Sequence, residues 1–181
     1  MHTFVNTLTL SRIFLAAIIF LLLMSPDGYL FALVLFFLAG ITDYLDGYFA
    51  RKYSVVSQFG EILDPIADKV LILFILFGLA VNLSSYLIGF LGAIIITREI
   101  WVGALRDLNA RKGKSDLTKV TFLAKIKTTI QLFTIAIYLL GLSLNNMLII
   151  VIGDIFLFIS TFITVYTGYL YTNNCFEDKA H

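Results

Sequence analysis

Long apolar segments dominate this sequence and leave little room for any fold other than a helical bundle in a membrane. Of its 181 residues, 60% are hydrophobic and 14% are charged, a balance outside the range of most soluble proteins. A transmembrane helix needs about 20 mostly apolar residues. Six segments meet that requirement: 5–24, 29–51, 57–81, 85–110, 118–142 and 147–171. We therefore predict an all-α, polytopic membrane protein in which residues 1–181 form a single bundle of six transmembrane helices.

The distribution of basic residues predicts the orientation of this bundle. The polar turns at 25–28, 82–85 and 143–146 contain no Lys or Arg, and all 13 of these residues fall on or toward the opposite side. Because basic residues are enriched in cytoplasmic loops, we expect that side and both termini to be cytoplasmic. The first segment lacks a small-residue cleavage site, so we expect it to be retained as a span. The single cysteine, Cys175, excludes an internal disulfide framework.

Four aspartates interrupt the second and third apolar segments. On a helix, one face would carry Asp43, Asp46, Gly47 and Ala50, at i, i+3, i+4 and i+7. The next helix would carry a matching face with Gly60, Asp64 and Asp68, at i, i+4 and i+8. Carboxylates near lipid are unfavourable unless a cation compensates them. Two such faces brought together would form an all-oxygen site for hard divalent cations, Mg²⁺ or Mn²⁺.

A carboxylate site of this kind could serve as a cation pathway, a proton relay or a catalytic centre. Four carboxylates in a small volume suit a two-metal site, where ions about 3.5–4 Å apart clamp a phosphoryl group during displacement. Gly47, Ala50 and Gly60 remove side-chain bulk beside the acids. These small residues could allow close helix packing or leave space for a nucleotide base, and both interpretations stay open.

A second cluster, of opposite charge, follows the aspartates in the sequence. Its members are Arg98, Arg106, Lys125 and Lys127. Basic residues in such proteins often anchor helix ends at the membrane surface, and we interpret Arg111, Lys112 and Lys114 in that way. Arg98 lies deeper, after four uncharged residues. A cationic pocket beside a divalent-metal site predicts a phosphorylated, anionic substrate.

These residues carry a resemblance to a known family. Residues 43–68 fit the pattern D-x2-D-G-x2-A-R-x8-G-x3-D-x3-D at every fixed position. This is similar to the signature of the CDP-alcohol phosphatidyltransferases, integral membrane enzymes with six transmembrane helices. The segments 6–12, 97–106 and 125–131 also resemble the bacterial phosphatidylglycerophosphate synthases within that family.

The resemblance implies a role for each residue of the pattern. Asp43, Asp46, Asp64 and Asp68 would bind two metal ions, Mg²⁺ or Mn²⁺, and Asp68 would also be the catalytic base. The implied site for CDP-diacylglycerol comprises Asn6, Gly47, Ala50, Arg51, Ser57 and Gly60. The implied site for the phosphate of sn-glycerol 3-phosphate comprises Arg98, Arg106, Lys125 and Lys127.

The implied reaction transfers a phosphatidyl group from CDP-diacylglycerol to glycerol 3-phosphate and releases CMP. The charges alone favour a phosphorylated acceptor and do not separate glycerol phosphate from inositol phosphate; serine and phosphatidylglycerol are further acceptors within the family. A cation transporter is the alternative from another class, but its acids would be spread through the membrane depth. The resemblance also implies a homodimer in a bacterial inner membrane, in contact with membrane lipid and without a nucleic-acid partner.

Overall fold

The computed structural model is helical, as predicted. It describes the backbone of residues 2–53, 58–113 and 122–177, and the side chains of these ranges except at 2–6, 8, 46, 48–53, 58, 59, 61 and 62. The elements in chain order are α1 (His2–Leu22), a 3₁₀ turn η1 (Pro26–Gly28), α2 (Tyr29–Tyr53), α3 (Gln58–Asn82), α4 (Tyr86–Arg111), α5 (Phe122–Ser143) and α6 (Met147–Glu177). Each of the six predicted segments falls on one of the six α-helices, which confirms the all-α class.

Length and composition identify membrane-spanning helices within the described residues. Four are long and apolar enough: Pro26–Leu45, Tyr86–Arg111, Phe122–Ser143 and Met147–Phe176. Helix α1 contributes a shorter apolar stretch, Thr9–Leu22. Large apolar side chains also cover the outside of the bundle; Phe14, Phe90 and Phe162 are each more than 60% exposed. These properties are those of an integral membrane protein, and six complete crossings stay a prediction.

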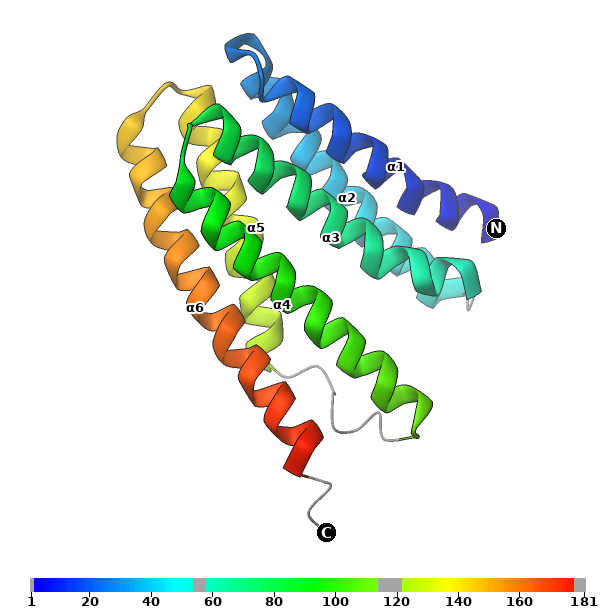
Figure 1. Cartoon of the computed structure of the whole chain (residues 1–181). Helices are drawn as coiled ribbons and strands as arrows, with labels where there is room; N and C mark the ends of the chain where they lie inside the picture. Colours follow the sequence, from blue (N-terminus) through cyan, green and yellow to red (C-terminus); the bar gives the residue numbers. More distant parts are fainter. Residues whose placement is uncertain (1, 54–57, 114–121, 178–181) are drawn as a thin grey trace.

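The six helices form two groups of three (Figure 1). Helix α1 packs on α2 and α3, and α6 packs on α4 and α5. Contacts of α3 with α4 and of α2 with α5 join the two groups. The three short turns lie at one end of the bundle, and both termini lie toward the other (Figure 1). The aspartates occupy the end of α2 and the beginning of α3, so they lie toward the end that carries the termini.

Two of the short turns have the same backbone conformation. At the end of α3, Ser84 has φ 48° and the Ser85 N–H donates to the Ala80 carbonyl. At the end of α5, Asn145 has φ 48° and the Asn146 N–H donates to the Gly141 carbonyl. These are Schellman-type caps, which satisfy the last carbonyls of a helix and reverse the chain within three residues. They hold α3 against α4 and α5 against α6 from the turn end.

One acidic residue outside the aspartate pattern has a structural partner. Tyr138 of α5 is fully buried, and its hydroxyl donates to Asp154 Oδ1 of α6 at 2.6 Å. Gly153 faces the same ring, since a Cβ at that position would lie 2.9 Å from Tyr138 Cδ1. Asp154 is therefore an interhelical hydrogen-bond acceptor, as expected for a polar residue inside a membrane bundle.

Replacing Asp154 with alanine should lower the free energy of unfolding by about 1–3 kcal/mol, because the buried Tyr138 hydroxyl loses its acceptor. Thermal unfolding of the detergent-solubilised protein measures this. Asp107→Ala is the matched control, since Asp107 pairs with Arg111 where both side chains are exposed and should contribute less than about 1 kcal/mol. Equal shifts for the two variants would contradict the structural role of Asp154.

Candidate active site

Three of the predicted aspartates converge on one arginine. Arg12 of α1 is 1% exposed, and its Nη1 contacts Oδ1 of both Asp43 and Asp68. Its Nη2 lies 3.5 Å from Asp64 Oδ1, and the Thr9 hydroxyl donates to the same oxygen at 2.6 Å. The carboxylates themselves are about half exposed. A buried guanidinium group requires such partners, because an uncompensated charge in this environment is strongly destabilising.

The position of Arg12 follows from the buried face of α1. Thr9, Arg12, Ala16, Ile19 and Leu23 are all at most 1% exposed. Their spacing of three or four residues forms one stripe, which packs against α2 and α3. Arg12 is the charged member of that stripe, so its side chain reaches the acids across the helix interface. Sequence reasoning counted Arg12 among the basic residues and within the family-like segment 6–12, but gave it no role in the site; a single cation within an apolar segment was the signal for one.

The carboxylate oxygens fit a hard divalent cation. Because one nitrogen of Arg12 contacts oxygens of both Asp43 and Asp68, those oxygens are no more than about 6 Å apart. Oxygen ligands alone, partly open to solvent, are the set that Mg²⁺ and Mn²⁺ prefer. Among the described side chains, no group of three acidic, His or Cys residues is arranged as a metal site, and Arg12 contacts both Asp43 and Asp68. A divalent cation at these oxygens would compete with the guanidinium group.

A cavity of about 440 Å³ adjoins the carboxylates. It lies between α3, α4 and α5, and Asp68 lines it. The cavity therefore begins at the carboxylate group and extends away from it into a differently charged region. Six charged side chains line it among the described residues: Asp68, Lys69, Arg98, Glu99, Arg106 and Lys127.

Glu99 and α6 hold the cations of this cavity in place. Glu99 Oε1 accepts from Lys127 Nζ and from Arg98 Nη1, the latter at 3.2 Å. From α6, Thr167 Oγ1 accepts from Arg98 Nη2 at 2.8 Å, and the Tyr171 hydroxyl lies 3.4 Å from Arg106 Nη2. The guanidinium carbons of the two arginines lie 5.9 and 5.2 Å from the centre of the Tyr171 ring, within cation–π range. Tyr171 thus fixes both arginines from one buried position.

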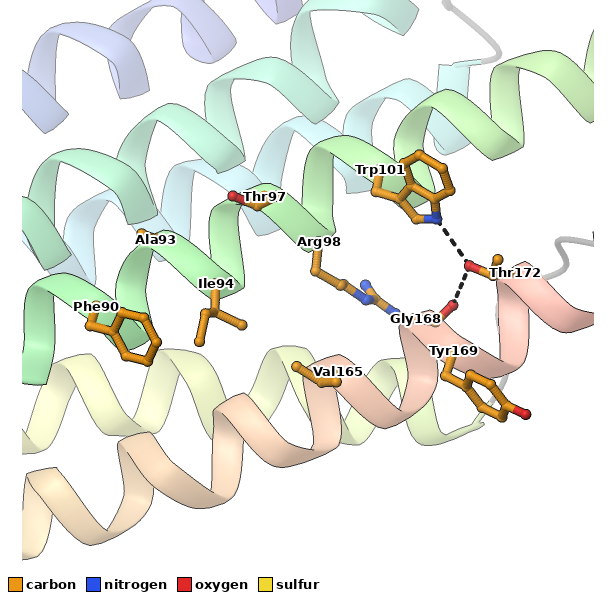
Figure 2. A pocket seen from close by; sticks show the side chains of 10 residues that line it. All are labelled: Phe90, Ala93, Ile94, Thr97, Arg98, Trp101, Val165, Gly168, Tyr169 and Thr172. Atoms are coloured by element: carbon orange, nitrogen blue, oxygen red, sulfur yellow. Dashed lines mark hydrogen bonds between the residues drawn. The ribbon is translucent and has the colours of Figure 1, made fainter.

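A glycine lets Arg98 reach α6. A Cβ at Gly168 would lie 2.9 Å from Arg98 Cγ and 3.0 Å from its Nε. Figure 2 shows the Arg98 side chain directed from α4 toward Gly168, with Trp101 and Thr172 joined by a hydrogen bond nearby. An apolar hollow of about 500 Å³ lies between α4 and α6, and Arg98 also lines it. Figure 2 shows the residues that line this hollow. Any larger residue at 168 would displace the guanidinium group.

The predicted site residues fall into three classes by position. The structure brings together Asp43, Asp64 and Asp68 at Arg12, and Arg98, Arg106 and Lys127 at the cavity. Lys125 is exposed and is not among the described lining residues, whereas Gly47 is half-buried on α2 and Gly60 is buried on α3. Ser57 and the side chains of Asn6, Asp46, Ala50 and Arg51 lie outside the described residues.

Sequence reasoning missed four side chains that organise the site: Thr9, Lys69, Thr167 and Tyr171. Gln131 is buried and lines the cavity, and its Nε2 has no hydrogen-bond partner among the described residues. That amide is therefore able to donate to a molecule in the cavity.

The family model described as CDP-alcohol phosphatidyltransferase matches residues 2–166. The chain belongs to this family. Members generally use divalent metal ions, in agreement with the oxygen ligands gathered at Arg12. In this phosphatidyltransferase the carboxylates gathered at Arg12 and the cations of the cavity thus lie next to each other, with Asp68 common to both groups.

Curated relatives cover almost the whole chain. A protein of Rickettsia bellii (strain RML369-C) is 39% identical over 94% of this chain and 93% of its own length. A protein of Rickettsia typhi (strain ATCC VR-144 / Wilmington) is 38% identical over 94% of this chain and 95% of its own. One from Cereibacter sphaeroides is 42% identical over 78% of this chain and 65% of its own. All three are named CDP-diacylglycerol–glycerol-3-phosphate 3-phosphatidyltransferase.

Replacing Arg12 with glutamine should destabilise the enzyme by about 1–3 kcal/mol in the presence of a chelator, because three half-exposed carboxylates lose their common cation. Added Mn²⁺ or Mg²⁺ should restore part of the lost stability, since a divalent cation neutralises the same oxygens. Thermal unfolding with and without metal measures both effects.

Arg111→Gln is the control for this experiment, because Arg111 pairs with Asp107 at the exposed end of α4. It should shift the melting temperature little, whether or not metal is present. An Arg12 variant that melts like this control would contradict the pairing described above.

Proposed function

We propose that this enzyme transfers the phosphatidyl group of CDP-diacylglycerol to sn-glycerol 3-phosphate, forming phosphatidylglycerol phosphate and CMP. The observation that carries this proposal is the cavity that joins Asp68 to Arg98, Arg106 and Lys127. It offers a carboxylate and an anion-binding wall within one space, as an acceptor with one hydroxyl and one phosphate requires. The names of the curated relatives support the same reaction.

Asp68 is well placed to act as the base. Its carboxylate lines the cavity and also belongs to the aspartate group at Arg12. It would accept the proton of the glycerol 1-hydroxyl, and that oxygen would attack the phosphorus that bears diacylglycerol. The bond from this phosphorus to the bridging oxygen would break, and CMP would leave with that oxygen. Positioning and charge neutralisation would account for most of the acceleration.

The remaining residues would hold the substrates. Arg98 and Arg106, fixed by Thr167 and Tyr171, would bind the acceptor's phosphate together with Lys127. Gln131 could donate to an acceptor hydroxyl. The cytidine end would lie at the predicted CDP site, which comprises Asn6, Gly47, Ala50, Arg51, Ser57 and Gly60.

The cofactor would be two divalent ions, Mg²⁺ or Mn²⁺, held by Asp43, Asp46, Asp64 and Asp68. When bound, such ions neutralise charge on a pyrophosphate. We further propose that the site faces the cytoplasm, that the membrane is a bacterial inner membrane, and that the enzyme is a homodimer. The positive-inside distribution supports the first point, and the family resemblance supports the other two.

Release of labelled CMP from CDP-diacylglycerol tests the reaction. Purified protein should release CMP with glycerol 3-phosphate when Mg²⁺ or Mn²⁺ is present, and not with a chelator. Asp68→Asn should lower kcat by about 10²–10⁴-fold, the range expected for loss of a general base. Release with inositol phosphate instead would keep the chemistry and change the acceptor. No release from folded protein with either acceptor would overturn the proposal and favour cation transport.

Gly168→Ala should raise the KM for glycerol 3-phosphate by about tenfold, because the added methyl group displaces Arg98 from its place beside α6. The KM for CDP-diacylglycerol should change by less than about twofold. Steady-state kinetics with each substrate varied measure both values. Gly89→Ala is the control, since its new Cβ would meet only Ala80 at 3.7 Å. An unchanged KM for glycerol 3-phosphate would remove Arg98 from the acceptor site.

A further inference from the structure

Helix α3 contributes residues both to the group at Arg12 and to the cavity, and the signature pattern includes only some of them. Asp64 and Asp68 point toward Arg12. Asp68 also lines the cavity, together with Pro65, Lys69 and Ile72, which lie at i, i+4 and i+7 on α3. Lys69 directly follows the proposed base, and its side chain extends from α3 across the cavity to α4. The signature pattern ends at Asp68 and does not include Lys69.

Lys69 differs from the other cations of the cavity in its bonding. Arg98 and Lys127 share Glu99, and Arg106 is close to the Tyr171 hydroxyl. Within the described part of the chain, Lys69 has neither an ion pair nor a hydrogen bond. A lysine turned into a cavity between helices, and not out to the membrane surface, is not an ordinary interfacial anchor. Its ammonium group is therefore available to an anion in the cavity.

Gly103 of α4 provides the space for that ammonium group. A Cβ at Gly103 would lie 2.8 Å from Lys69 Nζ, and it would meet no other atom within 4 Å. Glu99, Gly103 and Arg106 are spaced i, i+4 and i+7, so they share one face of α4. Lys69 Nζ thus lies over α4 at a level between Glu99 and Arg106. An anion bound by Arg106 would be within reach of a flexible lysine at this level.

The charge of the cavity supports the same conclusion. Among the described lining residues, four cations face two carboxylates, and one of these carboxylates, Asp68, is already paired with Arg12. The cavity therefore carries an excess of positive charge, to which Lys69 contributes one unit. A phosphate monoester carries about −1.5 to −2 at neutral pH, so an excess of this sign favours such an anion as the occupant.

We propose that Lys69 is a further binding residue for the phosphate of the acceptor, and that Gly103 is glycine so that the ammonium group can lie over α4. This inference rests on the proposed function and deepens it. Lys69 holds the acceptor from α3 while Arg98, Arg106 and Lys127 hold it from α4 and α5. Cations from three helices then hold the acceptor's phosphate, and its hydroxyl end is directed to Asp68.

Four variants test this proposal: Lys69→Met, Gly103→Ala, the double variant, and Gly89→Ala as the control on the same helix. Lys69→Met keeps the length of the side chain and removes its charge. It should raise the KM for glycerol 3-phosphate by about tenfold, as expected for one charge-assisted contact. The KM for CDP-diacylglycerol should stay within about twofold. Gly103→Ala should raise the acceptor KM when Lys69 is present and should have no further effect beside Lys69→Met.

Two results would overturn the proposal. One is an equal effect of Gly103→Ala in both backgrounds, which would assign Gly103 to packing alone. The other is a Lys69→Met enzyme whose KM for glycerol 3-phosphate is normal. A rise in the KM for CDP-diacylglycerol that exceeds the rise for glycerol 3-phosphate would overturn the proposal in the same way, because it would place the ammonium group at the transferred phosphate. Either result would leave the reaction itself intact, since wild-type CMP release measures that separately.

A binding measurement keeps the test independent of turnover. Inorganic phosphate should raise the melting temperature of the wild-type protein, and its apparent Kd should increase by about tenfold in Lys69→Met. Gly89→Ala should bind phosphate as the wild type does. If the wild type released no CMP with glycerol 3-phosphate, this comparison would still decide whether Lys69 binds an anion. Equal affinity in wild type and Lys69→Met would show that it does not.

Discussion

The pairing of Arg12 with three aspartates is the interaction on which the rest of the structure depends. A guanidinium group that is 1% exposed inside a membrane bundle is stable only among carboxylates, and those come from two other helices. The pairing therefore sets the rotation of α1, α2 and α3 about their axes. It also keeps the oxygens close together, as a divalent cation requires. One set of side chains thus serves both the packing of the first three helices and the proposed chemistry.

The second half of the bundle organises positive charge in the same indirect way. Glu99 neutralises part of it, while Thr167 and Tyr171 of α6 fix the arginines by hydrogen bonds and cation–π contacts. Helix α3 is the wall shared by the two halves, and Asp68 lies where they meet. An acceptor held in the cavity would therefore present its hydroxyl to Asp68, one of the proposed metal ligands. Because Asp68 and the cations lie on packed helices, the proposed base has a fixed position relative to the proposed anion site.

Side-chain periodicity predicted much of this but not the pairing across helices. The i, i+4 spacing of Asp64 and Asp68 was enough to place them on one face, and the structure brings them together with Asp43. Lys125 and Lys127 show the limit. They are two residues apart, so they point about 200° apart on a helix, and only Lys127 lines the cavity. Which of the two faces inward depends on how α5 is rotated against α3 and α4, and the spacing of residues does not contain that information.

The sequence by itself determined the helical segments, the shared face of Asp64 and Asp68, and the family, because each depends on residues that are close along the chain. Apolar length, helical period and a 26-residue pattern are all local properties. The tertiary structure decided what each charge contacts. It placed Arg12 among the acids, Tyr171 between two arginines, and Lys69 opposite Gly103. These contacts join residues far apart in the chain, and their geometry is set by the packing of whole helices, which no single segment specifies.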